Sequence, residues 1–173
     1  MRLFTAIVPG SEIIAGTEDM VSSLRRAGIR GNYTKPANIH ITLAFIGEYP
    51  DPKKVLEAMR SVTFEPYRLA LRGAGHFRDL IWAGIDSDGE LADHVSRLRQ
   101  ALDRYGIPYD RKPFSPHITI IRGASVIPDA IPGPSEAEMT VKSIVLMRSD
   151  RTPSGMVYAP VGRADSGKIT EKR

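Results

Sequence analysis

Two short phrases of the sequence each pair a histidine with a threonine two residues later. His40 and Thr42 stand in "KPANIHITLA", and His117 and Thr119 stand in "KPFSPHITII". Side chains two residues apart in a β-strand point to the same face, so each phrase would present an imidazole beside a hydroxyl and bury the isoleucine between them. Two imidazoles facing one cleft could carry out phosphoryl chemistry without a metal ion, because a neutral histidine takes a proton from water while a protonated one gives a proton to the leaving oxygen. The threonine hydroxyls would bind the phosphate oxygens.

The two phrases belong to a longer internal repeat. His117 follows His40 by 77 residues (117 − 40 = 77), and two of the four histidines occupy the motif. A single His-x-Thr is a common match and is usually a satisfied polar pair on a half-buried strand. The repetition with matching flanks therefore favours a site that was built twice. The same shift aligns Lys35 with Lys112, Pro36 with Pro113, residues 3–9 with 80–86, and the helical pattern near 11–28 with that near 88–105.

Runs of β-branched and apolar residues alternate with helical patterns along the chain. Strands are predicted at 2–8, 39–46, 65–73, 79–86 and 117–122, with a final hairpin made of 139–148 and 156–162. Helices are predicted from Ser11 to Gly28, at 52–61 and at 91–105, where apolar residues recur at steps of three and four. The proline-rich segment 124–138 is predicted to be an irregular connection. Duplicated strand-helix-strand units of this kind predict an α+β fold with two similar lobes.

Composition sets broad limits on what the protein can be. The 173 residues suit one domain or two small lobes that share a core, and 42% apolar with 25% charged residues is typical of a globular protein. A net charge of +4 permits an anionic partner such as RNA or a nucleotide without requiring one. The chain has no cysteine, which excludes disulfides, thiolate zinc sites and cysteine nucleophiles, and we expect a cytoplasmic protein. No apolar run is long enough to cross a membrane, and no histidine or carboxylate pair has the spacing of a common metal motif.

The other two histidines are weaker candidates. His76 lies in "GAGHF", and its glycine neighbours predict a loop residue at a turn or at the rim of a cleft. His94 falls one step off the apolar stripe of the helix at 91–105, so we expect it to face solvent. The glycines at 73–75 are too few for a nucleotide-binding loop.

At these residues the chain resembles the two-histidine (2H) phosphoesterases. "HITL" at 40–43 and "HITI" at 117–120 match their paired His-x-Thr-x motifs, and the closer match is to the RNA 2′,3′-cyclic phosphodiesterase branch, also called the 2′-5′ RNA ligase or LigT-like family. Three further stretches agree with that branch: "RLF.AI" at the N-terminus, "KP.N.H.TL.F.GE" at 35–48 and "PF.PH.T..R" at 113–122. The resemblance covers nearly the whole chain up to the final hairpin.

The resemblance implies a fold, a reaction and a set of roles. It implies a single bilobal α+β domain over residues 1–163, with antiparallel sheets lining a central cleft; we expect 164–173 to be a disordered tail. The implied reaction is hydrolysis of a 2′,3′-cyclic phosphate at an RNA end to a 2′-phosphomonoester, by a monomer that needs no metal or other cofactor. By analogy His40 would be the general acid and His117 the general base, while Thr42 and Thr119 would bind the phosphate.

Three more residues are candidates for substrate binding. Arg122 matches an arginine that the family often carries just after its second motif. In a regular strand over 117–122, Arg122 would point to the face opposite to that of His117. It must therefore reach the phosphate from the strand end or across a bulge. Tyr33 stands where the family commonly has tryptophan and could stack on a base or ribose. Phe114 could also be a stacking platform, although a core aromatic is the simpler interpretation.

Two alternative functions stay open: 2′-5′ RNA ligation, which is the reverse reaction at the same site, and a non-catalytic module that binds RNA ends.

Overall fold

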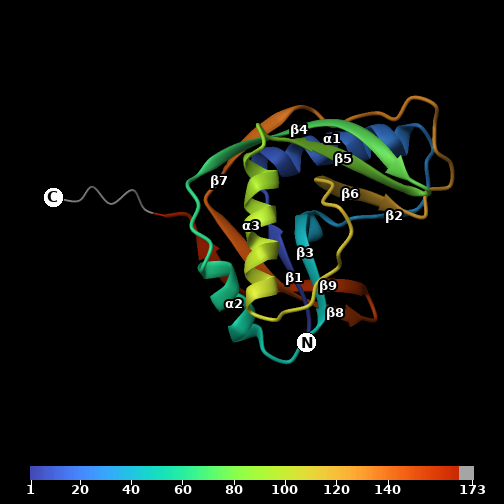
Figure 1. Cartoon of the computed structure of the whole chain (residues 1–173). Coiled ribbons are helices and arrows are strands. Elements are labelled where there is room, and N and C mark those ends of the chain that lie inside the picture. The colour runs from blue at the N-terminus through green and yellow to red at the C-terminus, as the bar shows by residue number, and fades with distance from the viewer. Residues whose placement is uncertain (168–173) are drawn as a thin grey trace.

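Two antiparallel sheets and three helices form the protein in a computed structural model, which describes residues 1–167 (Figure 1). In chain order the elements are β1 (Arg2–Ile7), α1 (Ser11–Arg26), β2 (Asn32–Tyr33), a short 3-10 turn η1 (Pro36–Asn38), β3 (Ile41–Glu48), α2 (Pro52–Arg60), β4 (Tyr67–Phe77), β5 (Leu80–Asp86), α3 (Glu90–Arg104), β6 (His117–Arg122), β7 (Ala137–Val141), β8 (Ser143–Thr152) and β9 (Gly155–Asp165). The predicted α+β class is confirmed.

The strand order shows the duplication. One sheet has the order β3-β1-β8-β9 and the other the order β2-β6-β5-β4-β7. All neighbouring strands are antiparallel, so β3-β1-β8-β9 matches β6-β5-β4-β7, and β2 is an additional edge strand. The two lobes predicted from the repeat are therefore present. We call them the β1 sheet and the β5 sheet.

The shift between the two copies is not constant. Ile7 pairs with Ile41 in one copy and Ala83 pairs with Ile118 in the other. The second strand of each copy is therefore shifted by 77 residues (118 − 41), whereas the first is shifted by 76 (83 − 7). A single offset aligns the His-bearing strands, and small insertions and deletions separate the other elements.

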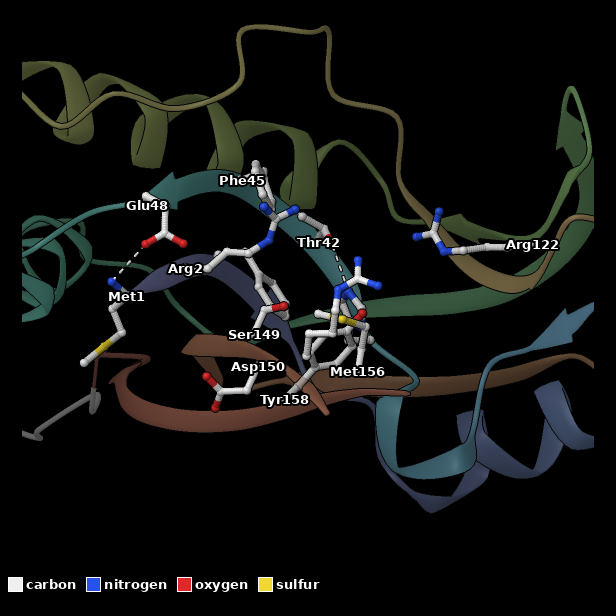
Figure 2. Close-up of a pocket in the computed structure, with 13 residues that line it drawn as sticks. Met1, Arg2, Thr42, Phe45, Glu48, Arg122, Ser149, Asp150, Met156 and Tyr158 are labelled. Atoms are coloured by element: carbon white, nitrogen blue, oxygen red, sulfur yellow. Dashed lines mark hydrogen bonds and ion pairs between the residues drawn. The ribbon is translucent and has the colours of Figure 1, made fainter. Parts of the chain in front are cut away.

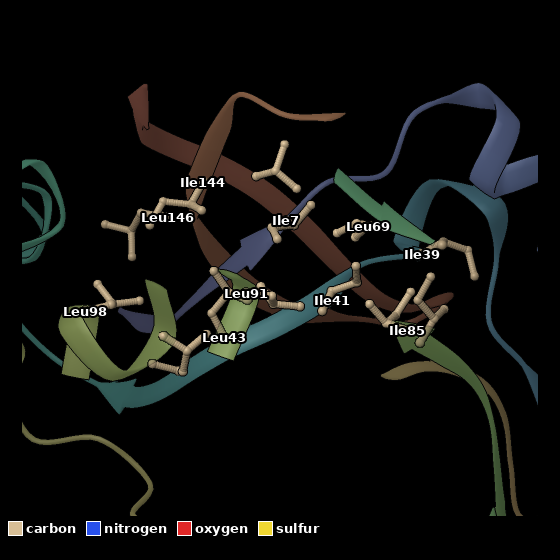
Figure 3. Close-up of a cluster of buried hydrophobic side chains, with 14 of the residues drawn as sticks. Ile7, Ile39, Ile41, Leu43, Leu69, Ile85, Leu91, Leu98, Ile144 and Leu146 are labelled. Atoms are coloured by element: carbon tan, nitrogen blue, oxygen red, sulfur yellow. The ribbon is translucent and has the colours of Figure 1, made fainter. Parts of the chain in front are cut away.

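Each long helix packs beyond its own copy. The helix α1 lies on β4 and β7 of the β5 sheet, and α3 contacts β3 of the β1 sheet as well as β4 and α2 (Figure 1). Both helices end at a glycine with positive φ, Gly28 (79°) and Gly106 (69°), which are 78 residues apart (106 − 28). Glycine suits this position because the left-handed conformation costs other residues energy. The two copies consequently share one hydrophobic core, in which side chains of both sheets and of α3 meet (Figure 3).

Several boundaries and one burial prediction are corrected by the structure. The predicted strand 139–148 is two strands, β7 and β8, because the chain turns at Lys142 to pass from one sheet to the other. The strand β9 continues to Asp165, so the tail does not begin at residue 164, and 168–173 lie outside the described residues. His76 lies within β4 rather than in a loop. His94 does not face solvent: it is 1% exposed and stacks on Phe64 with ring centroids 4.1 Å apart.

Two further findings concern the described part of the chain as a whole. Within residues 1–167, no helix is both long and apolar enough to cross a membrane. In the same range, no three His, Asp or Glu side chains gather closely enough to hold a metal ion.

Candidate active site

His40 stands immediately before β3 and is held from both sides. Its Nδ1 lies 2.7 Å from the carbonyl oxygen of Asn38. A carbonyl only accepts, so Nδ1 carries the proton and Nε2 is the nitrogen available for chemistry, 2.9 Å from the Thr42 hydroxyl. The ring forms a three-membered cluster with Phe4 and Tyr158, whose centroids lie 5.0 and 5.1 Å from it and 5.1 Å from each other.

His117 repeats this arrangement at the start of β6. Its Nδ1 lies 2.7 Å from the carbonyl oxygen of Ser115, which stands 77 residues after Asn38 (115 − 38). The ring meets Phe77 edge to face at a centroid distance of 5.4 Å and lies 6.4 Å from the Trp82 ring. Both imidazoles are therefore oriented by the main chain two residues upstream, and both keep Nε2 for the cleft.

The charges around His40 show that the two copies meet. Burial lowers the pKa of His40, while the hydrogen bond from Nδ1 to Asn38 raises it. The positive charges of Arg122 and His117 lower this pKa further, so both groups lie close enough to act on the imidazole. These effects bias His40 towards its neutral form, and a bound phosphate would oppose that bias.

A β-bulge decides where Arg122 points. The ladder between β5 and β6 skips Ile120, and both Ile120 and Ile121 are fully buried. One extra residue reverses the alternation, so Arg122 returns to the face that carries His117 and Thr119. The sequence left two routes open for Arg122, and the structure contains the bulge.

The same bulge occurs in the first copy. The ladder between β1 and β3 skips Leu43, and Leu43 and Ala44 are both buried. Phe45 therefore shares the face of Thr42, at the position equivalent to Arg122 in the repeat (122 − 45 = 77). One copy presents an aromatic ring where the other presents a guanidinium.

Two hollows adjoin at this site. The larger has a volume of about 730 Å³ and is lined by residues of the β1 sheet together with Arg122, which reaches from β6 towards Thr42 (Figure 2). The second has a volume of about 500 Å³ and contains His117. Thr42 and Phe45 line both hollows, so the hollow that contains His40 and the one that contains His117 are direct neighbours.

The remaining candidates lie at different distances from this cleft. Thr119 is half-buried on the strand face between His117 and Arg122. Phe114 is half-buried and packs against the core, and it also lines the second hollow, so its role as a stacking platform stays a prediction. Tyr33 lines neither hollow: the guanidinium of Arg25 of α1 lies over its ring, and its hydroxyl donates to the carbonyl of Ile29, just after that helix, at 2.6 Å.

Sequence reasoning did not find the side chains that the β1 sheet adds to the cleft. Arg2 and Phe4 come from β1, which the sequence marks only as a strand, and Arg151 and Tyr158 come from the C-terminal hairpin. No local motif marks these four residues, and the pairing of β1 with β8 and of β8 with β9 brings them to one sheet. Asn38 was within a motif, but its role through the main chain has no sequence signal.

Comparison with known proteins identifies the class to which this fold and site belong. Residues 14–153 match the model of the 2′-5′ RNA ligase superfamily. The chain is 30% identical over 172 residues to the RNA 2′,3′-cyclic phosphodiesterase of Archaeoglobus fulgidus, covering 91% of this chain and 96% of that protein. It is 32% identical over 173 residues to the protein of that name from Thermus thermophilus, covering 91% and 86%.

A solved structure agrees over nearly the whole chain. The crystal structure of E. coli LigT complexed with 3′-AMP superimposes with a TM-score of 0.84 at 26% identity, covering 96% of this chain and 98% of that one. The protein therefore belongs to the 2′-5′ RNA ligase superfamily.

Proposed function

We propose that this protein is an RNA 2′,3′-cyclic phosphodiesterase, which opens a terminal 2′,3′-cyclic phosphate to leave a 2′-phosphomonoester. Its relatives that carry this name support the proposal. The main structural support is that the Nδ1 atom of each histidine contacts a main-chain carbonyl. This contact leaves the Nε2 atom of each histidine available for proton transfer to or from a substrate. A phosphate placed between them would have a proton donor and a proton acceptor on opposite sides.

The mechanism follows from these positions and from the family roles. Nε2 of His117 takes a proton from water as the water oxygen bonds to phosphorus. The bond from phosphorus to the 3′ oxygen breaks, and Nε2–H of His40 gives its proton to that oxygen. The 2′ oxygen keeps the phosphate, and solvent returns the two histidines to their starting states. Because His40 must begin protonated, the negative charge of the bound phosphate has to raise its pKa against the effect of Arg122.

Three side chains would bind the phosphate during this reaction. The hydroxyls of Thr42 and Thr119 share the faces of the two histidines and would donate to non-bridging oxygens. Arg122 reaches the same face through its bulge, and its guanidinium would balance the charge that builds up on phosphorus. The carbonyls of Asn38 and Ser115 would stabilise each imidazolium as it forms.

One observation favours ligation as a second activity. The hollow beside His117 is lined by Phe77 and Phe114 and has room for more than a water molecule. A 5′-hydroxyl nucleoside bound there could replace water as the nucleophile, which would join two RNA ends through a 2′-5′ bond. A non-catalytic RNA-end-binding module is disfavoured, because both histidines keep the contacts that prepare Nε2.

The test is the product formed from a nucleoside 2′,3′-cyclic phosphate. We expect a 2′-phosphate, and we expect His40→Ala and His117→Ala each to lower kcat by about 10²–10⁴-fold, which is the usual contribution of acid–base catalysis. His76→Ala, on the exposed end of β4, is the matched control and should retain activity. Near-normal turnover by either active-site variant, a 3′-phosphate product, or activity abolished by EDTA would refute the mechanism.

Three features remain predictions from the sequence: action as a monomer, independence of cofactors, and a cytoplasmic location.

A further inference from the structure

The larger hollow holds more positive charge than one phosphate requires. Its two carboxylates are already paired: Glu48 with the amino group of Met1 at 3.2 Å, and Asp150 with Arg148 at 2.8 Å. Three guanidinium groups line the hollow without a carboxylate partner among residues 1–167: Arg2, Arg122 and Arg151. A 2′,3′-cyclic phosphate carries a single negative charge, so this surplus indicates a second anionic group on the substrate.

The three arginines divide by position. Arg122 comes from β6 across the cleft, and its charge acts on His40. Arg2 lies on β1 two residues beyond Phe4, whose ring packs on His40, which places it roughly 7 Å further along the same strand face. Arg151 lies near the end of the neighbouring strand β8, where it pairs with Met156, and lines the same hollow. Arg2 therefore stands about one nucleotide from His40, and Arg151 faces the same hollow from β8.

Arg2 is also held in a way that suits phosphate binding. Its guanidinium lies over the Phe45 ring, 4.8 Å from the centroid. Stacking on an aromatic ring orients the planar group and leaves its edge N–H donors for an anion. Both arginine side chains are exposed to the cleft, so neither contributes to the core.

We propose that Arg2 and Arg151 bind the phosphodiester on the 5′ side of the terminal nucleotide and thereby select RNA ends over free nucleoside 2′,3′-cyclic phosphates. The proposal rests on the phosphodiesterase function proposed above. Guanidinium groups bind phosphate oxygens through paired, charge-assisted hydrogen bonds. A free nucleoside cyclic phosphate has a 5′-hydroxyl at this position and gains nothing from the two arginines.

The test compares three substrates that differ only at the 5′ oxygen: adenosine 2′,3′-cyclic phosphate, the same molecule with a 5′-phosphate, and the dinucleotide that ends in it. For the wild-type protein we expect kcat/KM to rise at least about tenfold when the 5′-phosphate is added, since hydrogen bonds to a charged group are worth that much. The dinucleotide should show a similar gain. We define the selectivity as kcat/KM for the 5′-phosphorylated substrate divided by kcat/KM for the substrate without that phosphate. In the Arg2→Gln/Arg151→Gln double variant we expect this selectivity to fall about tenfold. We also expect it to depend less on salt concentration than in the wild-type protein.

The outcomes separate the two proposals. Arg26→Gln, on the outer face of α1, is the matched control and should keep the wild-type selectivity. An unchanged selectivity in the double variant would overturn the assignment of Arg2 and Arg151. A gain with the dinucleotide but not with the 5′-phosphate would also overturn it, because the second nucleoside rather than its phosphate would then be recognised. If the wild-type protein hydrolyses none of the three substrates, the proposed function itself fails.

Discussion

His40 and His117 make the same contact with the main chain but stand in different surroundings. His40 packs against both Phe4 and Tyr158 and has the Thr42 hydroxyl at its Nε2. His117 meets Phe77 and Trp82 instead, and among residues 1–167 its Nε2 has no hydrogen-bond partner. At the scale of single residues the repeat therefore supplies two equivalent groups, and the neighbours make them unequal.

The pKa of His40 gives a direct test of its charged neighbours. The guanidinium of Arg122 disfavours a second positive charge on the imidazole, so Arg122→Gln should raise the pKa of His40. Titration of the His40 ring signals by NMR would measure the change. Inorganic phosphate added to the wild-type protein should shift this pKa in the same direction. A pKa that stays constant or falls in the variant would contradict the proximity of the two groups.

The motif residues could be predicted from sequence because the signal is local. His40, Thr42, His117 and Thr119 all follow from strand alternation and from the repeat. The side on which Arg122 lies could not be decided, because the bulge adds one residue and leaves only the adjacent pair Ile120 and Ile121, which is no distinctive pattern. The cleft residues at the two chain ends were missed because strand partners are set by the fold.

At the scale of elements, the hairpin of β4 and β5 supports His117. Gly75 lies opposite Trp82, and a Cβ at Gly75 would collide with the indole ring. Gly75 therefore serves packing, since its missing side chain gives Trp82 its place beside His117.

Replacement of Gly75 should lower the activity, because the residue supports the ring that packs beside His117. We expect Gly75→Ala to displace Trp82 and lower kcat/KM severalfold, by disturbing the rings that pack on His117. Steady-state kinetics and the emission of Trp82, the single tryptophan, would measure the effect. Gly10→Ala is the control, because a Cβ there meets nothing within 4 Å. Wild-type kinetics with an unchanged emission spectrum would show that the ring is not displaced.

The burial of His94 makes the packing of α3 sensitive to acid. Its Nδ1 is 2.9 Å from the Tyr67 hydroxyl, its Nε2 has no hydrogen-bond partner within residues 1–167, and burial lowers its pKa to about 4. The unfolded chain takes up this proton near pH 6.5, whereas the folded chain does not until about pH 4. The contribution of neutral His94 is therefore complete above pH 6.5 and is lost as the pH falls towards 4, by about 3 kcal/mol.

Urea unfolding at pH 7 and pH 4 would measure this loss. We expect the free energy of unfolding to fall by about 3 kcal/mol more in the wild-type protein than in His94→Gln over this interval. His76→Gln, on the exposed part of β4, should follow the wild type. Equal pH dependence in wild type and His94→Gln would contradict the assignment.

The error over His94 has a physical reason. A narrow apolar stripe predicts one packed face, but α3 contacts α2, β3 and β4, so its buried surface is wider than the stripe. The existence of the helix followed from its periodicity, and the width of its buried face depended on partners that are distant in sequence.

At the scale of the whole molecule, the two copies are interleaved. The helix α1 follows β1 in the chain but covers the other sheet, and β8 and β9 complete the β1 sheet from the far end of the sequence. Side chains from both sheets belong to one buried cluster. Neither copy has a complete core of its own.

We therefore expect a single cooperative unfolding transition. Far-UV circular dichroism reports on both sheets and the helices, whereas Trp82 fluorescence reports on the β5 sheet alone. Urea curves recorded with the two probes should have coincident midpoints. Separate midpoints would show that the lobes unfold independently despite the shared cluster.

The exchange of arginine for phenylalanine between equivalent positions 122 and 45 has a consequence for the choice of product. A cleft with perfect twofold symmetry would hold a cyclic phosphate equally well in two orientations, and the two ester oxygens would have equal chances of release. With a cation on one side and an aromatic ring on the other, the orientations become unequal in energy. Duplication supplied a pair of like groups, and in the proposed reaction the divergence at positions 45 and 122 would add to the unequal surroundings of the two histidines in distinguishing the 2′ oxygen from the 3′ oxygen.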